Sequence, residues 1–428
     1  MGGRRSAPSG RRSSTAGVAI ARHGRLPNRH PVAAILKFFT AAVAVVLVSA
    51  VSLGAITYAQ LNRNITTVAL VGQEDEVVAA PPALGKFEGG FNILIVGNDK
   101  CENPKGCKDR EGELNDVTML LHVSEDQTEA VAVSFPRDLV VPIPSCPDPE
   151  GGDFNSMSAQ PINVTLSYGG LACTVLTVEA LTGLDIPYAG LITFNGVISM
   201  STAVGGVPVC INGPLRDAYT GLDLPAAGTY PLEGQQALAF LRSRHGVGDG
   251  SDLGRISSQQ VFLSSLVRTI KSDSTLTDFP KLFGIAQAAT SNMTLSDSLA
   301  PLNTQVSMAL TLKDIPLERI TFVQYPNTTG QGGVYAGKVA PIKSQATALF
   351  DKIRNDEAFI LDSGTGRGSV ADPNAPAPQT RVPSTDVAAD PSTNPAAPLD
   401  PSAPAGPEVL DGVLGQTAAE YTCSKVNR

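Results

Sequence analysis

The sequence predicts an α/β fold, in which a central, mainly mixed β-sheet is flanked by helices and preceded by one N-terminal transmembrane helix. Two observations predict it. Short apolar runs rich in β-forming residues, each bounded by turn residues, are interspersed with longer segments of helical spacing. An uninterrupted apolar run near the N-terminus stands apart from them. With 428 residues and 42% hydrophobic content, the chain can bury a sizeable core.

The apolar run FFTAAVAVVLVSAVSLGAITYA, residues 38–59, contains no charged residue and is long enough to cross a bilayer. A cleaved signal peptide is the alternative, but its apolar part is usually shorter. Seven arginines and Lys37 precede the run, and only Arg63 follows closely. The positive-inside rule therefore predicts a single-pass protein of the cell membrane, with a cytoplasmic N-terminus and an extracytoplasmic remainder.

Charge and cysteine usage agree with this topology. The net charge is −8, yet no acidic residue precedes Glu74, so the exported part is acidic. Because that part also lacks Trp, nucleic acid is not an expected partner. All six cysteines follow the apolar run, on the side where disulfides persist. Plausible pairs are Cys101 with Cys107 and Cys146 with Cys173, and Cys423 is placed to tether the C-terminal segment either to the domain or to another chain.

The composition divides the chain into five parts. Residues 363–409 contain ten prolines among small and polar residues, and such a segment buries too little apolar surface to offset its ordering entropy. Only VLDGVLGQTAAEYTC, close to the end, regains apolar residues. The predicted parts are a disordered basic cytoplasmic head (1–36), the transmembrane anchor (37–60), a stalk (61–90), one folded extracytoplasmic domain (91–361) and a disordered Pro/Ala/Asp-rich extension (362–428).

The folded domain has a clear order of expected elements. Buried strands are predicted at residues 91–97, 117–123, 129–135 and 318–326 because these runs are apolar, short and bounded by turn residues. Helices are predicted at residues 171–183, 233–244, 256–272 and 296–312 because apolar residues recur there at helical spacing.

Two carboxylates stand at the ends of neighbouring predicted strands. Asp99 follows FNILIVG, and Asp116 directly precedes VTMLLHV, so both are placed to meet at one edge of the sheet. Paired carboxylate oxygens suit Mg²⁺. The alternative is that both are ordinary turn residues.

Arginines gather in two later segments. Arg137 emerges from a strand end in SFPRDLVVPIP, beside Asp138, where a solvated ion pair is the alternative interpretation. Arg242 and Arg244 end one predicted helix, and Arg255 begins the next, near a positive helix N-terminus. Arginines beside a helix N-terminus predict a phosphate or pyrophosphate site. His245 lies inside the same loop. The chain contains neither a GxSxG motif nor a phosphate-loop motif, so the sequence supports neither a serine hydrolase nor a nucleotide-driven kinase.

These segments together resemble the LytR-CpsA-Psr family of bacterial cell-envelope proteins, which attach anionic glycopolymers to peptidoglycan. The resemblance covers residues 91–272. It is carried, in order, by NILIVGND, NDVTMLLHV, SFPRDLVVPIP, INVTLSYGG and LEGQQALAFLRSRHGVGDGSDLGRISSQQ. Each fragment is weak alone, but five in order behind a single membrane anchor form a specific pattern.

The resemblance implies roles for individual residues. Asp99 and Asp116 match the acidic pair that holds Mg²⁺ (or Mn²⁺) against the substrate pyrophosphate, and Gln259 matches a nearby polar contact. The residues that match the pyrophosphate-binding arginines are Arg137, Arg242, Arg244 and Arg255. The implied catalytic set is Asp99, Asp116, Arg137 and Arg255, with the general base left open among Asp99, Asp116 and Asp138.

Two positions depart from the family pattern. Leu114 stands where the family usually has an arginine, and Ser258 replaces another arginine before the glutamines. Arg110, in the preceding loop, is a candidate substitute for the first of these. The resemblance also implies a lipid groove under the sheet, to which the apolar stretches 175–181 and 186–194 are expected to contribute.

The implied function is Mg²⁺-dependent phosphotransfer in cell wall assembly, from a polyprenyl-pyrophosphate-linked anionic glycopolymer, such as a teichoic acid, to a peptidoglycan sugar hydroxyl. Two alternatives stay open. One is a hydrolase that cleaves the polyprenyl pyrophosphate at the same site. The other is a non-catalytic membrane regulator or lipid-binding protein, since the family once carried a transcription-attenuator label.

Overall fold

The computed structural model describes residues 31–63, 65–71, 87–99, 113–148, 150–272, 275, 278–361, 364–375 and 407–427. The chain divides into two compact units, the first ending at Tyr58 and the second beginning at Ala59. Each unit is described by itself. Residues 1–30 of the head predicted at residues 1–36 lie outside the described residues.

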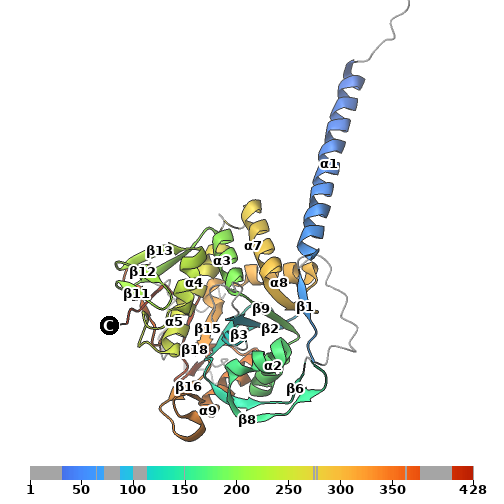
Figure 1. Cartoon of the computed structure of the whole chain (residues 1–428). Coiled ribbons are helices and arrows are strands. Elements are labelled where there is room, and N and C mark those ends of the chain that lie inside the picture. The colour runs from blue at the N-terminus through green and yellow to red at the C-terminus, as the bar shows by residue number, and fades with distance from the viewer. Residues whose placement is uncertain are drawn as a thin grey trace, which may run out of the picture. The chain divides into compact units, whose positions relative to one another are not determined.

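The first unit contains most of helix α1 (Pro31–Arg63), the long blue helix in Figure 1, whose residues 59–63 belong to the second unit. Its segment Leu36–Ile56 has a mean hydropathy of 2.3 and is long and apolar enough to cross a membrane. The helix begins inside the predicted head and covers the whole run that the sequence marked as an anchor. A second segment, Ile162–Thr182, passes the same test, but it is 56% buried and belongs to the core of the other unit.

The second unit is built on an eight-stranded mixed sheet. In spatial order its strands are β1 (Thr66–Val68), β14 (Met293–Ser296), β9 (Tyr188–Ile192), β2 (Phe91–Asn98), β3 (Asn115–Val123), β4 (Ala130–Phe135), β15 (Ile320–Gln324) and β21 (Gly415–Thr417). Every residue of β4, AVAVSF, is buried, as expected for a central strand that is covered on both faces. The four strands predicted from the sequence are therefore confirmed.

Helices cover both faces of this sheet. On one face, α2 (Thr165–Thr182) and α9 (Lys343–Arg354) share an apolar cluster with Leu94, Leu120 and Val133 of the sheet. On the other face, α8 (Leu302–Asp314) and α5 (Asp252–Ile270) pack with Met119 and Phe322. The remaining helices of eight or more described residues are α3 (Phe194–Val204), α4 (Gly234–Arg242) and α7 (Phe279–Asn292). The α/β fold with a mixed sheet flanked by helices is confirmed.

A second sheet has the order β13 (Gly228–Leu232), β10 (Val207–Ile211), β22 (Thr422–Ser424) and β19 (Ser369–Ala371). Phe240 of α4 and Phe262 of α5 pack with Val209 of this sheet in a third apolar cluster. Smaller strand pairs complete the unit: β11 (Leu215–Asp217) with β12 (Leu222–Leu224), β5 (Val140–Ile143) with β8 (Met157–Pro161), β6 (Cys146–Pro147) with β7 (Asp153–Phe154), β16 (Asn327–Thr329) with β17 (Val339–Pro341), and β18 (Phe359–Leu361) with β20 (Glu408–Leu410).

The chain after Leu361 differs from the prediction. Residues 364–375 and 407–427 belong to the fold: β21 extends the large sheet beside β15, and β22 lies in the second sheet between β10 and β19. Val413 and Ala418 are buried there, so burial of the apolar residues near the end of the sequence offsets the entropy lost when this segment is ordered. Disorder predicted for the whole of 362–428 is therefore wrong for these residues, while 376–406 lie outside the described residues.

Three other boundaries shift for local reasons. Residues 66–68 of the predicted stalk form β1, which pairs with β14. The helix predicted at 296–312 begins at Leu302, after Pro301, because Pro lacks the N–H that a helix interior requires. Helix α2 begins before residue 171 and is kinked at Gly170, where φ is +67°, a value that glycine adopts readily.

Two disulfides occur among the described residues. Cys146 bonds to Cys173, as predicted, across 27 residues of sequence. Cys210 of β10 bonds to Cys423 of β22 across 213 residues, which confirms that Cys423 ties the end of the chain to the domain. Cys101 and Cys107 lie outside the described residues.

Candidate active site

The sheet brings the two predicted carboxylates, Asp99 and Asp116, to the same end of two adjacent central strands, which we call one edge of the sheet. Strands β2 and β3 are antiparallel, with Asn98 paired to Asn115, so the end of β2 lies beside the start of β3. Asp99 is buried, and its Oδ1 accepts a hydrogen bond of 3.0 Å from the backbone N of Leu114. The carboxylate is thus held by the main chain of Leu114, whatever side chain occupies that position.

Arg137 reaches the same edge from the next strand. The antiparallel register of β3 and β4 pairs Thr118 with Phe135, and extending it by two residues places Arg137 opposite Asp116. Arg137 Nη1 donates to Asp116 Oδ1 at 2.5 Å. The neighbouring Asp138 accepts from Lys338 Nζ at 3.1 Å, and its Oδ2 also lies 3.7 Å from Arg137 Nε.

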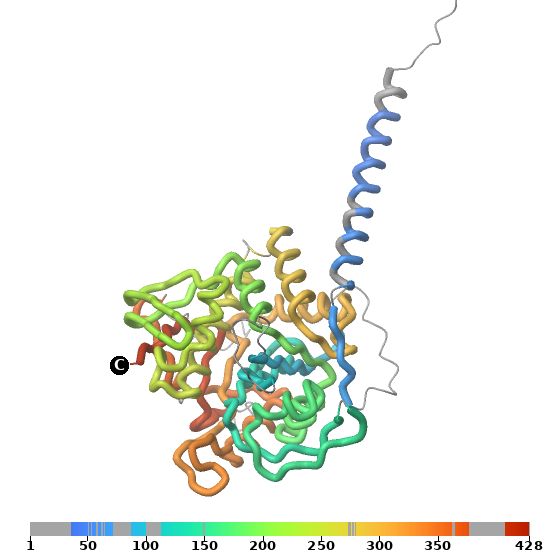
Figure 2. The backbone as a smooth tube through the Cα atoms, viewed as in Figure 1, coloured from blue at the N-terminus to red at the C-terminus, as the bar shows by residue number. Residues whose placement is uncertain are grey.

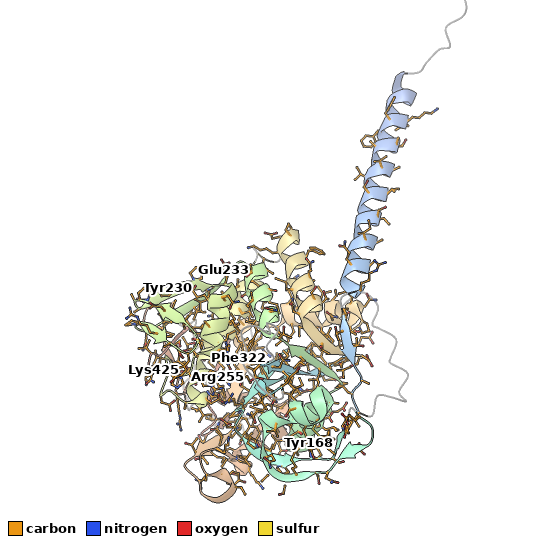
Figure 3. All side chains as sticks on the ribbon, viewed as in Figure 1. Tyr168, Tyr230, Glu233, Arg255, Phe322 and Lys425 are labelled. Atoms are coloured by element: carbon orange, nitrogen blue, oxygen red, sulfur yellow. A yellow bond between two sulfur atoms is a disulfide. The ribbon has the colours of Figure 1, made fainter. Side chains whose placement is uncertain are left out.

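Two more arginines converge on Asp116, Arg244 from the connection between α4 and α5 and Arg255 from the first turn of α5. We call residues 243–251 the arginine loop. Arg244 Nη2 lies 3.6 Å from Asp116 Oδ1, and Arg255 Nη1 lies 3.9 Å from the same oxygen. Arg255 Nη2 also donates to the backbone carbonyl of Asp116 at 2.7 Å. Figure 3 labels Arg255 in the interior of the domain, and only 3% of its side chain is exposed.

A further carboxylate, Asp252, completes this cluster and was not predicted. It is the first residue of α5, and its Oδ1 lies 2.7 Å from Arg255 Nη2 and 3.6 Å from Arg244 Nε. The spacing of three residues between Asp252 and Arg255 on a helix was the available sequence signal. Three arginines and two aspartates leave a formal charge of +1, close to the N-terminus of α5, an environment that favours an anion.

Some polar atoms of the cluster lack a hydrogen-bond partner. The Nε atoms of Arg137 and Arg255 and Oδ2 of Asp252 are buried without one, while Oδ1 of Asp252 has only its ion pairs with Arg255 and Arg244. Buried polar atoms are nearly always paired, so unpaired ones at a charged cluster point to a missing ligand. The unpaired N–H groups of two arginines suit phosphate oxygens.

The electrostatics fix the ionisation states. Burial raises the pKa of the Asp116 carboxyl, but the charge of Arg255 and the hydrogen bond and charge of Arg137 outweigh it, so this pKa lies below its ordinary value. Burial lowers the pKa of the Arg244 guanidinium, and the nearby charge of Arg255 lowers it further. Asp116 is therefore ionised at neutral pH, and the like charge of Arg255 beside Arg244 favours a bound anion.

Two residues predicted to bind the pyrophosphate, Arg242 and Gln259, lie outside the cluster. The Arg242 guanidinium is 4.5 Å from the ring centroid of Phe194, and the residue is exposed. Gln259 Nε2 donates to the carbonyl of Leu241 at 2.8 Å, which ties α5 to α4. Ser258 is buried with its Oγ 2.7 Å from Ser424 Oγ, so β22 occupies the side of α5 toward which this position points. Arg110 lies outside the described residues.

Asp217 organises the arginine loop from within the domain. Its side chain is buried, and its Oδ2 accepts from Ser243 Oγ at 2.8 Å, Arg244 N at 3.1 Å and Gly246 N at 3.3 Å. Burial raises the pKa of this carboxyl, but these hydrogen bonds together outweigh it and lower the pKa below its ordinary value. Sequence reasoning missed Asp217, since nothing in LRDAYTG distinguishes it from an ordinary turn aspartate.

The C-terminal end of the chain forms hydrogen bonds with the same loop. We call residues 422–427 the C-terminal clasp. Gly248 N donates to the carbonyl of Lys425 at 2.8 Å, and Asn427 N donates to the carbonyl of Gly246 at 3.0 Å. In Figures 2 and 3 the red C-terminal segment, with Lys425 labelled, runs beside the yellow-green part of the chain that contains the loop. The loop is therefore held on both sides by distant residues.

The sheet edge also suits a divalent cation. Asn98 Oδ1 is buried without a hydrogen bond, next to Asp99 and on the edge that carries Asp116. Mg²⁺ is bound by oxygen atoms, commonly one or two carboxylates plus substrate phosphates, and these residues fit that pattern. Among the described residues, a tighter cluster of possible metal ligands is formed by Cys210, Asp372 and Cys423, but its two sulfurs are joined in a disulfide.

A cavity of about 410 Å³ lies between α2, α9 and the β5–β8 pair. Ala180 and Leu181 line it, together with Tyr325 and Phe350. Val175 and Val178, from the same stretch of α2, are buried in the core. The expectation that residues 175–181 and 186–194 contribute to a lipid groove stays a prediction.

The mixed sheet and the cluster of arginines and carboxylates define an α/β domain with an anion-binding edge. The sequence matches the LytR_cpsA_psr family over residues 56–350, more than half of the chain, and the protein belongs to this family. The match does not include the C-terminal clasp.

Two curated relatives and one solved structure illustrate the similarity. The cell wall biosynthesis protein LcpA of Corynebacterium glutamicum is 26% identical over 315 residues, which cover 65% of this chain and 58% of that protein. The polyisoprenyl-teichoic acid–peptidoglycan teichoic acid transferase TagT of Bacillus subtilis is 24% identical over 72% of this chain and 91% of its own length. Protein gbs0355 of Streptococcus agalactiae matches 63% of this chain and 88% of its own, with a TM-score of 0.51 at 21% identity, and thus shares the fold.

The matches cover little more than half of the first two curated relatives, 58% of LcpA and 52% of a probable cell wall biosynthesis protein LcpB. Distant relatives of the chain are teichoic acid–peptidoglycan transferases by name.

Proposed function

We propose that the protein is a membrane-anchored phosphotransferase. It moves an anionic glycopolymer from a polyprenyl-pyrophosphate donor to a sugar hydroxyl of peptidoglycan, outside the cell membrane. The observation that carries the proposal is the convergence of Arg137, Arg244 and Arg255 on Asp116 at the N-terminus of α5.

The cluster has the properties that a pyrophosphate requires. Guanidinium groups bind phosphate oxygens through paired N–H donors, and burial strengthens such charge-assisted hydrogen bonds. Asp116 and Asp252 hold the three arginines close together before the donor arrives. A pre-organised cluster loses less entropy on binding and is ready to stabilise the charge that develops during transfer.

The transfer forms one bond and breaks one. The hydroxyl oxygen of the acceptor sugar attacks the phosphorus that carries the glycopolymer, and the bond from this phosphorus to the bridging oxygen breaks. Polyprenyl phosphate leaves with the electron pair, and the hydroxyl proton passes to a base. Negative charge grows on the leaving oxygen, where Arg137, Arg244 and Arg255 stabilise it.

Asp116 is poorly suited to accept the proton. Its lowered pKa and its ion pairs with the arginines make it a weak base. Asp99 and Asp138 remain the candidate carboxylates. Asp99 and Asp116, with Asn98 beside them, would hold Mg²⁺ or Mn²⁺, which supplies additional charge compensation for the phosphoryl oxygens.

The membrane helix and the lipid donor fit one another. The apolar segment Leu36–Ile56 would anchor the chain in the bilayer that also holds the polyprenyl tail. The excess of arginine before this segment supports a cytoplasmic N-terminus and an extracytoplasmic domain, where the disulfides are stable.

The experiment measures two products at once. Full-length protein in detergent is given a polyprenyl-pyrophosphate-linked glycopolymer, peptidoglycan fragments and Mg²⁺, and both released polyprenyl phosphate and joined glycan are quantified. We expect both products from wild type and neither from Arg255→Ala or Asp116→Ala. Arg216→Ala is the matched control, because Arg216 is a surface residue paired with Asp223.

The remaining outcomes separate the alternatives. Release of polyprenyl phosphate without joined glycan would identify a hydrolase and contradict transfer. Binding of the donor without either product would identify a lipid-binding or regulatory protein.

A further inference from the structure

Beside the arginine loop lies an aromatic side chain that the proposed transfer does not use. Tyr219, in the β11–β12 hairpin, is 81% exposed. Among the described residues of the second unit, no other large apolar or aromatic residue is as exposed; Val334 follows at 62% and Val71 at 49%. Exposing an aromatic ring sacrifices the free energy of its burial, so such a ring calls for an explanation.

Tyr219 is stacked on a residue of the arginine loop. Its ring lies 4.3 Å from the imidazole of His245, centroid to centroid, with an angle of 28° between the planes. His245 is itself exposed. The two rings are stacked face to face at the surface, which leaves the outer face of the Tyr219 ring open to solvent, and we call this pair the aromatic platform.

The platform is joined to the anion-binding cluster through adjacent residues. Arg244 directs its guanidinium to Asp116 and Asp252, while the next residue, His245, stacks on Tyr219 at the surface. Neighbouring residues of one loop thus serve the interior cluster and the surface. The platform and the cluster are therefore connected through the consecutive residues Arg244 and His245.

One buried carboxylate fixes both parts. Asp217 Oδ1 accepts from Tyr219 N at 3.0 Å, and Oδ2 accepts from Arg244 N at 3.1 Å and Gly246 N at 3.3 Å. On the other side of the loop, the carbonyl of His245 accepts from Asn427 Nδ2 at 3.0 Å. Both aromatic residues are therefore held at the backbone, and the platform is pre-organised rather than a freely moving side chain.

We infer that the aromatic platform of Tyr219 and His245 is the binding site for an uncharged pyranose ring of the acceptor glycan. This inference rests on the proposed function. Sugar rings present apolar C–H faces that pack on aromatic rings, and tyrosine is among the residues that contribute most to binding interfaces. His245 directly follows Arg244, so we expect a sugar ring bound at the platform to bring an acceptor hydroxyl toward the cluster.

Charge favours the neutral acceptor over the anionic donor polymer. The nearest arginine on the hairpin, Arg216, is paired with Asp223 at 2.9 Å, and Asp217 is already engaged by backbone N–H groups. The hairpin therefore offers no unpaired cation to a polyanion, whereas the interior cluster does. A neutral N-acetylhexosamine fits the platform better than a phosphate-bearing unit.

The test measures binding directly. The uncharged N-acetylglucosamine tetramer is titrated into full-length protein in detergent by calorimetry, with wild type, Tyr219→Ala, Tyr219→Phe and Tyr421→Ala. We expect Tyr219→Ala to bind at least about 10-fold more weakly than wild type, as for an aromatic residue central to an interface. Tyr219→Phe keeps the ring and should bind like wild type, as should Tyr421→Ala, which removes a different exposed tyrosine.

Two results would overturn the inference. One is equal affinity of wild type and Tyr219→Ala, or no binding by wild type. The other is preferential binding of polyglycerol phosphate, an anionic polymer, in a manner that depends on Tyr219. Because Tyr219 is exposed, its variants should unfold at the wild-type temperature, which separates a binding defect from a folding defect.

Failure of the proposed function leaves a different signature. Binding of the tetramer through Tyr219 without any joining of glycan would support the sugar site and contradict the proposed transferase function. If transfer is observed, Tyr219→Ala should raise the KM for the acceptor and leave the KM for the lipid donor unchanged. A transferase whose acceptor KM is unaffected by Tyr219→Ala would contradict the platform alone.

Discussion

The two halves of the candidate site are built in different ways. Asp99, Asp116 and Arg137 are positioned by adjacent strands whose register fixes them at one edge of the sheet. Arg244 instead belongs to a loop that is held by Asp217 on one side and by the C-terminal clasp on the other. The strand-based half therefore depends on the central fold, whereas the loop-based half depends on contacts between residues far apart in the sequence.

The largest effect is expected where the two halves meet. Arg255→Ala removes the ion pairs with Asp116 and Asp252 and the hydrogen bond to the Asp116 carbonyl. We expect glycan transfer to fall by about 10²–10³-fold, the usual loss for one group that stabilises transition-state charge. Initial transfer rates at saturating donor would measure this loss. A decrease no larger than that of the surface variant Arg216→Ala would contradict the assigned role.

The second effect concerns the loop-based half alone. Asp217→Asn keeps the shape of the side chain but weakens the hydrogen bonds to Ser243, Arg244 and Gly246. We expect transfer to fall by about 10-fold or more, since small displacements of positioning groups have large effects on rate. The matched control is Asp223→Asn, an exposed aspartate of the same hairpin. Equal rates for the two variants would show that the loop does not need its internal support.

The third effect compares the two disulfides. Replacing Cys210 and Cys423 by Ser releases the C-terminal clasp, and we expect a loss of about 4–5 kcal/mol in the free energy of unfolding together with reduced transfer. Replacing Cys146 and Cys173 should cost about 3 kcal/mol, because the closed loop is shorter, and should leave the rate per folded molecule unchanged. Chemical denaturation and transfer assays on both double variants measure the two quantities. Equal transfer rates per folded molecule in the two double variants would contradict the claim that the loop-based half depends on the C-terminal clasp.

The smallest effect is the dependence of stability on pH. The folded-state pKa values of Asp116 and Asp217 both lie below their ordinary values. Each carboxylate therefore stabilises the fold above its ordinary pKa of about 4, and this contribution is lost as the pH falls through the lowered folded-state value. We expect the free energy of unfolding to decrease from pH 5 to lower pH, as followed by denaturation at several pH values. Asp217→Asn should show a shallower decrease, and an unchanged slope would contradict the assigned ionisation.

The sequence predicted the strand-based half better than the loop-based half, for a physical reason. Period and composition reveal buried strands, and the adjoining ends of antiparallel strands lie together, so Asp99 pairs with Leu114, two residues before Asp116. The α4–α5 loop offered arginines but no sign that Arg242 would stack on Phe194 rather than join the cluster. Asp217 and Asp252 act through long-range contacts that no local pattern records.

The C-terminal part shows the same limit. A proline-rich composition indicates disorder, and this interpretation was extended over strands β20 to β22, whose few apolar residues are stabilised by β15, β10 and β18. The pairing of Cys146 with Cys173 was predictable from nearby cysteines, and Cys423 was expected to form a tether, but its partner Cys210 was not identified. Ser258, a departure from the family pattern, is explained only by its contact with Ser424 of the clasp.

The most direct test of the central claim is the dissociation constant for a short polyprenyl pyrophosphate, measured with Mg²⁺ for wild type, Arg255→Ala and Arg216→Ala. We predict that Arg255→Ala binds at least about 10-fold more weakly than wild type, as expected for loss of a charge-assisted contact, while Arg216→Ala binds normally. Equal affinity of Arg255→Ala and wild type would contradict the claim that the arginine cluster around Asp116 binds the donor.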